Sequence, residues 1–211
     1  MNGFTSRTTG LWMLAVGITG ILAIVTLLLF FVGLFQNIRS LSSLGSLNDA
    51  LNALTGLLSA VLAAVLQPAL RRLAPRSGPV LLLSVWAGAL AITFGSWLII
   101  TGRSDVELSS YYFFFGNGLL GIWLWMLNRV TRLQAAWPPR LTRWGLVAGG
   151  FMMVGLLGLY GILSGSDGEG YSSLVMVSGI SFLGTGILYP LWCMRLGRSI
   201  LSQQDARSLK A

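Results

Sequence analysis

Six long apolar runs, separated by short polar segments, limit how this chain can fold more than any other feature. About 20 apolar residues in an α-helix cross the roughly 30 Å hydrocarbon core of a membrane, and a helix satisfies its backbone hydrogen bonds there without water. We therefore predict an all-α, polytopic bundle of transmembrane helices in a single domain, residues 1–211, with no soluble domain. The predicted helices cover about residues 11–35, 50–70, 79–101, 111–128, 144–164 and 172–194.

Composition supports lipid rather than water as the solvent. Apolar residues make up 55% of the chain and charged residues 9%, against about a quarter charged in ordinary globular proteins. The net charge of +8 could indicate a nucleic-acid partner. The basic residues, however, occur in short groups between the apolar runs. We therefore expect membrane lipids, and no nucleic acid, as partners.

The distribution of basic residues predicts the orientation of the bundle. With six crossings, all but two of the 14 Lys and Arg residues fall on the side that holds both termini, and the exceptions are Arg39 and Arg103. Cytoplasmic loops retain Lys and Arg. We therefore predict cytoplasmic N- and C-termini in a plasma membrane or a bacterial inner membrane. The residues on the cytoplasmic side are Arg7, Arg71, Arg72, Arg76, Arg129, Arg132, Arg140, Arg143, Arg195, Arg198, Arg207 and Lys210.

A gap-free internal match indicates a repeated two-helix hairpin. At an offset of 63, Gly95 matches Gly158 and Arg132 matches Arg195. Such a repeat would place the third and fourth helices parallel to the fifth and sixth. Chance matching in a chain of biased composition is the alternative explanation.

The residue types needed for most membrane chemistry are missing from the predicted helices. No ionisable residue lies in the middle of a run, whereas such residues usually mark proton relays, ion paths and voltage sensors. Histidine is absent, and Cys193 is the only cysteine, which excludes histidine-ligated haem and clusters of cysteine ligands. We expect no cofactor and no enzymatic activity, since no catalytic constellation is present.

One face of the second helix is polar. Asn48, Asn52, Thr55 and Ser59 follow one another at steps of 4, 3 and 4 residues, which places them in line on a helix. They could form hydrogen bonds between helices. Alternatively, they could form a polar wall along a solute path or a lipid headgroup. The run they interrupt needs neighbours that shelter these groups.

Glycine spacing predicts close helix packing. Gly155, Gly158 and Gly161 recur at steps of three, and small residues on one face let helices approach within a protomer or between protomers. The segment Gly116–Gly118 could instead loosen the fourth helix beside a binding site.

Two sets of charged residues carry further candidate roles. The acids would be solvated turn residues, or alternatively a site for a hard cation such as calcium. The arginines would be topology signals, or alternatively contacts for anionic lipid headgroups. The acids are Asp105, Glu107, Asp167 and Glu169, and the arginines are Arg71, Arg72, Arg129, Arg132, Arg195 and Arg198.

These features predict a non-enzymatic, multi-pass membrane protein that acts through helix packing. It would be an accessory, assembly or stress-related membrane component that forms a homo-oligomer or binds a membrane partner protein. The alternative is a small permease or channel-like protein for a neutral or amphipathic solute, which would use the polar face of the second helix.

Overall fold

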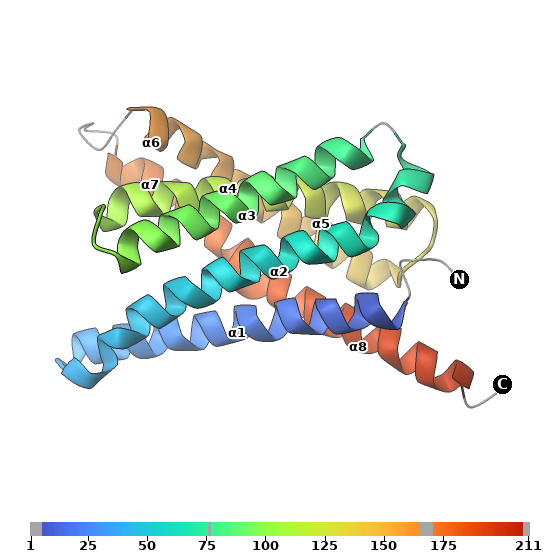
Figure 1. Ribbon diagram of the computed structural model, residues 1–211, viewed down its shortest axis with the longest axis horizontal. Helices are drawn as coiled ribbons and strands as arrows, with labels where there is room; N and C mark the ends of the chain where they lie inside the picture. Colours follow the sequence, from blue (N-terminus) through green and yellow to red (C-terminus); the bar gives the residue numbers. More distant parts are fainter. Residues whose placement is uncertain (1–5, 76, 165–170, 209–211) are drawn as a thin grey trace.

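The computed structural model describes residues 6–75, 77–164 and 171–208, and helices form six rods across them (Figure 1). No strand occurs in those ranges, so the all-α prediction is confirmed. The first four rods are α1 (Arg7–Phe35), α2 (Ser43–Leu73), α3 (Gly78–Ile100) and α4 (Val106–Leu133), with a short 3₁₀ turn, η2 (Arg39–Leu41), before α2.

The last two rods are interrupted. The fifth comprises α5 (Pro139–Met153), the 3₁₀ turn η3 (Val154–Leu157) and α6 (Gly158–Ser164). The sixth comprises α7 (Tyr171–Phe182), the π-helix η4 (Leu183–Leu188) and α8 (Tyr189–Ser208). Since α3 and α4 are continuous, the two halves of the predicted repeat differ locally, and the duplication stays a prediction.

Recognisable caps set the ends of several helices. The side chain of Ser6 accepts a hydrogen bond from the Thr9 amide at the start of α1, and Asp105 does the same for Leu108 at the start of α4. The helices α1, α3 and α4 each end with one residue of positive φ, as in left-handed C-terminal caps. These residues are Asn37, Gly102 and Ala135.

Two boundaries differ most from the sequence prediction. The second helix begins at Ser43 rather than near residue 50, so that Asn48 and Asp49 lie inside it. The sixth rod continues to Ser208 rather than ending near residue 194. A pattern of apolar residues predicts only the part of a helix that contacts lipid, so the polar ends of these two helices were not predicted from it.

The rods pack as a closed set. Each of the first four rods contacts the next, and α8 returns to lie along α1. Both chain ends and the α2–α3 and α4–α5 connections lie at one end of the bundle, which we call the terminal end (Figure 1). The opposite end carries the α1–α2 and α3–α4 turns and is called the distal end.

The fourth helix is the most enclosed by neighbours, since it contacts α2, α3, α5, α6 and α7. Among the described residues, five rods are long and apolar enough to cross a membrane, and α4 is not one of them. Its interior-facing residues include Asn117, Asn128 and Trp123, which are less hydrophobic than the aliphatic residues of the other rods. The sequence predicts that the second helix most needs neighbours to shelter its polar groups, whereas in the structure the fourth helix is the rod that is not apolar enough to cross a membrane.

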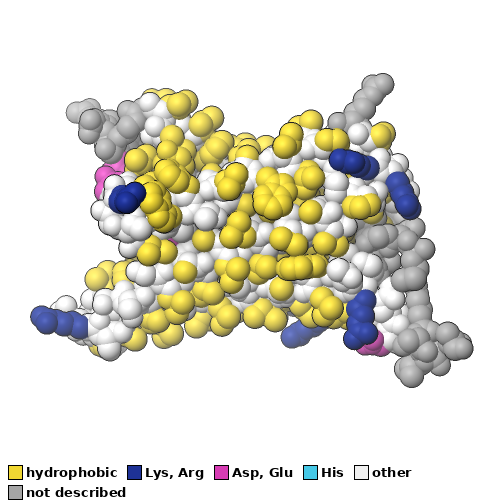
Figure 2. Space-filling view, in the orientation of Figure 1, with side chains coloured by type: hydrophobic (Ala, Val, Ile, Leu, Met, Phe, Trp, Pro, Cys, Tyr) yellow, Lys and Arg dark blue, Asp and Glu magenta, His cyan; other side chains and the backbone are white. Residues whose placement is uncertain are grey.

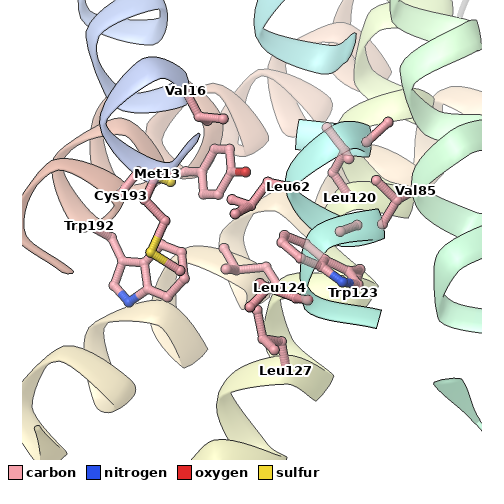
Figure 3. Packing of buried hydrophobic residues seen from close by; sticks show 14 of the residues in the cluster. Met13, Val16, Leu62, Val85, Leu120, Trp123, Leu124, Leu127, Trp192 and Cys193 are labelled. Atoms are coloured by element: carbon pink, nitrogen blue, oxygen red, sulfur yellow. The ribbon is translucent and has the colours of Figure 1, made fainter. Parts of the chain in front are cut away.

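The apolar core lies nearer the terminal end. Figure 3 shows Met13, Val16, Leu62, Leu124 and Trp192 converging there from four helices. These side chains are fully buried. The other half of the bundle contains a small internal cavity and a groove, whose largely apolar linings include several polar residues.

Candidate functional site: a polar cavity and groove

The polar face of α2 divides into two parts. Asn48, Asn52 and Thr55 line a small internal cavity of about 20 Å³. One turn further on, Ser59 is fully buried, and its hydroxyl accepts a hydrogen bond of 2.9 Å from the Tyr189 hydroxyl of α8. Three residues therefore face a cavity and the fourth faces a seam between helices.

Residues from α1, α2, α3, α4, α7 and η4 line the internal cavity. Its volume suffices for about one water molecule, which also needs polar partners. Thr55 donates its hydroxyl hydrogen to the Leu51 carbonyl, and Thr185 donates to the Ser181 carbonyl, so both oxygens are left as acceptors. The lining residues are Gly20, Ala23, Ile24, Asn48, Asn52, Thr55, Gly56, Ile92, Phe113, Asn117, Leu120, Phe182, Thr185 and Gly186.

Asn117 is the most unusual residue of this lining. Its side chain is 1% exposed, and neither its amide nitrogen nor its amide oxygen has a hydrogen-bond partner. A buried polar group without a partner costs about 1–3 kcal/mol. A native group of this kind calls for an explanation such as a bound water or ligand. The amide of Asn117 is therefore available to hydrogen-bond a molecule in the cavity.

The glycines on either side of Asn117 have packing roles. A Cβ on Gly116 would lie 2.5 Å from the carbonyl oxygen of Gly88 in α3, and one on Gly118 would lie 2.6 Å from the Leu156 amide nitrogen. The helix α4 is continuous here, so the alternative that this segment is loosened is wrong. The two glycines let α3 and η3 approach closely enough to enclose Asn117.

A larger groove lies next to the internal cavity, toward the distal end. It has a volume of about 580 Å³ and shares Asn48, Asn52, Phe113 and Phe182 with that cavity. In Figure 2 the outline is notched at this end, between the lobe of the α1–α2 turn and the lobe of the α3–α4 turn. Pockets of about 300–1,000 Å³ commonly hold small molecules, so the groove has the size of a ligand site.

The walls of the groove are aromatic and its polar groups are small. Phe30 and Phe31 of α1 stand on one side, and Phe113 and Phe114 of α4 stand on another. The hydroxyl of Ser109, which is 1% exposed, has no hydrogen-bond partner. The other lining residues are Leu27, Ser42, Gly45, Ser46, Asn48, Asp49, Asn52, Gly95, Ser96, Ile99, Val106, Ser110 and Phe182.

The π-helix η4 forms one wall of the internal cavity through Thr185 and Gly186. Proline has no amide hydrogen, so Pro190 cannot donate to the Gly186 carbonyl four residues earlier. A π-turn just before it is a common local adjustment in helices, frequently at functional sites. Pro190 also packs on α1, where a Cβ on Gly20 would lie 2.5 Å from its ring.

The bundle is closed between the cavity and the terminal end. The Tyr189 ring stacks on Trp192 with centroids 6.1 Å apart, and Trp137 meets Trp192 edge-on at 5.7 Å. The indole nitrogen of Trp192 donates a 2.9 Å hydrogen bond to the Leu141 carbonyl. This packed cluster lies between the internal cavity and the terminal end.

The outer acids are only partly described. Asp105 caps α4, and Glu107 lies in the first turn of that helix, whereas Asp167 and Glu169 lie outside the described residues. No group of three or more potential metal ligands occurs in the described part of the chain. The described pair thus has a local structural role at the start of α4.

The six candidate lipid-contacting arginines are all exposed. They lie where α2 and α4 end and on α8, and Figure 2 shows most of the basic side chains gathered at the terminal end. Arg129 lies over the Trp125 ring at 5.3 Å, and Arg195 lies over Trp144 at 4.8 Å. Arginine paired with an amphipathic ring suits the headgroup level of a membrane.

No protein-family model, curated protein or solved structure matches this chain. The fold and composition alone define its class, which is a multi-pass helical membrane protein with five apolar spans among the described residues. Sequence reasoning identified three cavity residues on α2 and named the segment Gly116–Gly118 as a possible neighbour of a binding site, but it gave Asn117 no role of its own and missed Thr185. A single asparagine in an apolar run carries no periodic signal, so only the packing of α4 against α2 and η4 brings it to the site.

Proposed function

We propose that this protein is a non-enzymatic small permease for a neutral or amphipathic solute, which enters the groove from the distal end. The single observation that carries the proposal is the buried, unpartnered amide of Asn117 in a cavity that also contains Asn48 and Asn52. Closure at Tyr189 and Trp192 corresponds to one state of an alternating-access cycle.

The glycine pattern supports this choice over the accessory-protein hypothesis. That hypothesis was motivated in part by glycine-rich faces, which could pack within a protomer or against another protomer. In the structure, Gly155 packs on the Phe114 carbonyl and Gly158 on the Tyr111 carbonyl, both in α4. Gly161 packs on the Tyr111 ring. These glycines therefore pack against α4 of the same chain and are not available to contact another protomer.

An accessory or assembly role is the second candidate, and α1 is the observation that favours it. Only 22% of its most apolar stretch is buried inside the chain. The remainder would contact lipid, a second copy of this chain or a membrane partner protein. Crosslinking through α1 in native membranes, with no effect of cavity substitutions on any transport, would favour this role.

We further propose that the terminal end faces the cytoplasm. The support is the gathering of exposed arginines there, because Lys and Arg are retained on the cytoplasmic side. The distal end, with the groove, then faces the outside of a cell membrane. Arg71, Arg72, Arg129, Arg132, Arg195 and Arg198 would contact anionic headgroups at the inner surface.

Thiol accessibility tests the proposed permeation route. In a Cys193→Ala background, we expect Asn52→Cys and Thr55→Cys to react with a water-soluble, membrane-impermeant thiol reagent, since both positions line the cavity. Ser59→Cys should not react, because Ser59 is fully buried against Tyr189. Leu90→Cys is the control for labelling from lipid, because Leu90 is 61% exposed on the apolar surface of α3. A cysteine there should not react, since thiolate formation is disfavoured in lipid.

The labelling pattern decides the proposal. Reaction at residues 52 and 55 but not at 59 or 90 supports an aqueous route that ends at the seam. Equal lack of reaction at 52, 55 and 90, with a loop position such as Gly102→Cys labelled, would exclude the route.

A further inference from the structure

We infer that the groove binds a monovalent organic cation with an apolar body, and that Asp49 is its counter-ion. This inference rests on the proposed function and names the substrate class for the same site. Among the described residues that line the groove, Asp49 is the only charged one. Asp49 precedes the second predicted helix, which covers about residues 50–70, whereas the structure places it in the second turn of α2.

The first argument is the charge balance of the site. Asp49 is partly buried, and no hydrogen bond or ion pair of its carboxylate occurs among the described residues. The nearest candidate cation in sequence, Arg39, does not line the groove but lines a neighbouring hollow, which shares Phe30 and Ser42 with it. A carboxylate in a groove without a basic residue attracts a cation.

The second argument is the wall chemistry. Phe30 packs over the backbone of Gly45, where a Cβ would lie 3.2 Å from its ring. Phe30 and Phe31 have centroids 5.7 Å apart, and Phe113 and Phe114 have centroids 5.9 Å apart. The faces of aromatic rings attract cations, and aromatic enclosures recognise quaternary ammonium groups in particular. Rings from α1 and α4 therefore line the same groove as Asp49.

The third argument concerns the unpartnered polar groups. The Ser109 hydroxyl in the groove and the Asn117 amide in the adjoining cavity are both 1% exposed and without a hydrogen-bond partner. Such groups are normally satisfied by a bound molecule. A cation with a polar substituent can use them, while its apolar part contacts the phenylalanine rings.

Equilibrium dialysis tests the assignment with the full chain in lipid nanodiscs and empty nanodiscs as the blank. The probes are benzyltrimethylammonium, the uncharged N-benzylacetamide and the anionic benzylsulfonate, which share one ring and differ in charge. We expect saturable binding of the cation and no binding of the anion. Asp49→Asn should weaken cation binding about tenfold, since it removes the charge and keeps the side-chain shape. Binding of N-benzylacetamide should stay within about twofold.

Asp105→Asn is the matched control. Asp105 is exposed at the same end of the bundle, caps α4 and does not line the groove. Asparagine also caps helices well, so the folded state is kept and cation binding should not change. An equal loss of binding with Asp105→Asn, or an unchanged affinity with Asp49→Asn, would overturn the role of Asp49.

The outcomes separate this inference from the proposed function. Binding of N-benzylacetamide without binding of the cation overturns the cation assignment and leaves a route for neutral solutes intact. Lack of binding by all three probes, together with unreactive Asn52→Cys and Thr55→Cys, overturns both.

Discussion

At the scale of single residues, Asn117 links the stability of the bundle to its proposed function. Its amide lies in a cavity whose other groups leave it without a hydrogen-bond partner. Proteins retain such locally unfavourable groups mainly where a ligand needs them. Ser59, on the polar face of α2, accepts a hydrogen bond from Tyr189 and therefore has a structural role.

We expect Asn117→Leu to stabilise the protein and to weaken solute binding. Leucine removes an unpartnered buried amide, which should raise the free energy of unfolding by about 1–2 kcal/mol, and its side chain can extend into the neighbouring cavity. Thermal unfolding in detergent and dialysis with N-benzylacetamide measure the two effects.

Asn128→Leu is the control on the same helix. The amide nitrogen of Asn128 donates a hydrogen bond to the Leu124 carbonyl, whereas its amide oxygen has no partner, and the side chain packs tightly on Gly145, away from the cavity. The same substitution there should lower stability by about 1–3 kcal/mol through overpacking and leave binding unchanged. If both variants shift stability in the same direction, the amide of Asn117 has a partner in the membrane-embedded protein.

At the scale of helices, the fifth rod depends on close contact between backbones. The 3₁₀ turn η3 brings Gly155 against the carbonyl of Phe114 in α4, where a Cβ would collide with the backbone. Glycine is the residue that permits such an approach. The interruption of this rod and the cavity next to α4 therefore have a common structural basis.

We expect Gly155→Ala to destabilise the bundle by about 1–3 kcal/mol, as overpacked substitutions do. Gly150→Ala, in the preceding helix α5, has open space where the methyl group would go. It should be neutral or stabilising by up to about 1 kcal/mol, because alanine favours the helix. Melting temperatures of the two variants in the same detergent provide the measurement, and equal destabilisation would contradict the packing role of Gly155.

At the scale of the whole molecule, the two halves of the bundle differ in chemistry. The terminal half has an apolar core with Trp192 and Leu124, and the distal half has a cavity and a groove that contain polar residues such as Asn52 and Asn117. Exposed arginines gather around the terminal half (Figure 2). A packed terminal end surrounded by arginines and a distal end with a groove are compatible with the proposed entry of a solute from the distal end.

We expect both ends of the chain to be cytoplasmic. Fusions of a reporter that fluoresces only in the cytoplasm should be bright when they end at Arg72, Arg140 or the C-terminus. They should be dark when they end at Gly102, because the α3–α4 turn lies at the distal end. The reverse pattern would invert the proposed orientation and place the groove on the cytoplasmic side.

The fold class and the order of the rods could be read from the sequence. Apolar runs of this length require helices in lipid, and helical spacing put Asn48, Asn52, Thr55 and Ser59 on one face. The inclusion of Asp49 in α2 could not be read, because a polar first turn resembles a loop until its neighbours are known.

The tertiary structure alone decided which polar residues form a site. Local spacing orders residues along one helix, but it contains no information about which helix lies opposite. The packing of α4 and η4 against α2 is what leaves Asn117 beside a cavity and gives Ser59 a partner in Tyr189. A polar face becomes a cavity or a seam according to the volume of the side chains across from it, and that volume is set by contacts between residues far apart in the chain.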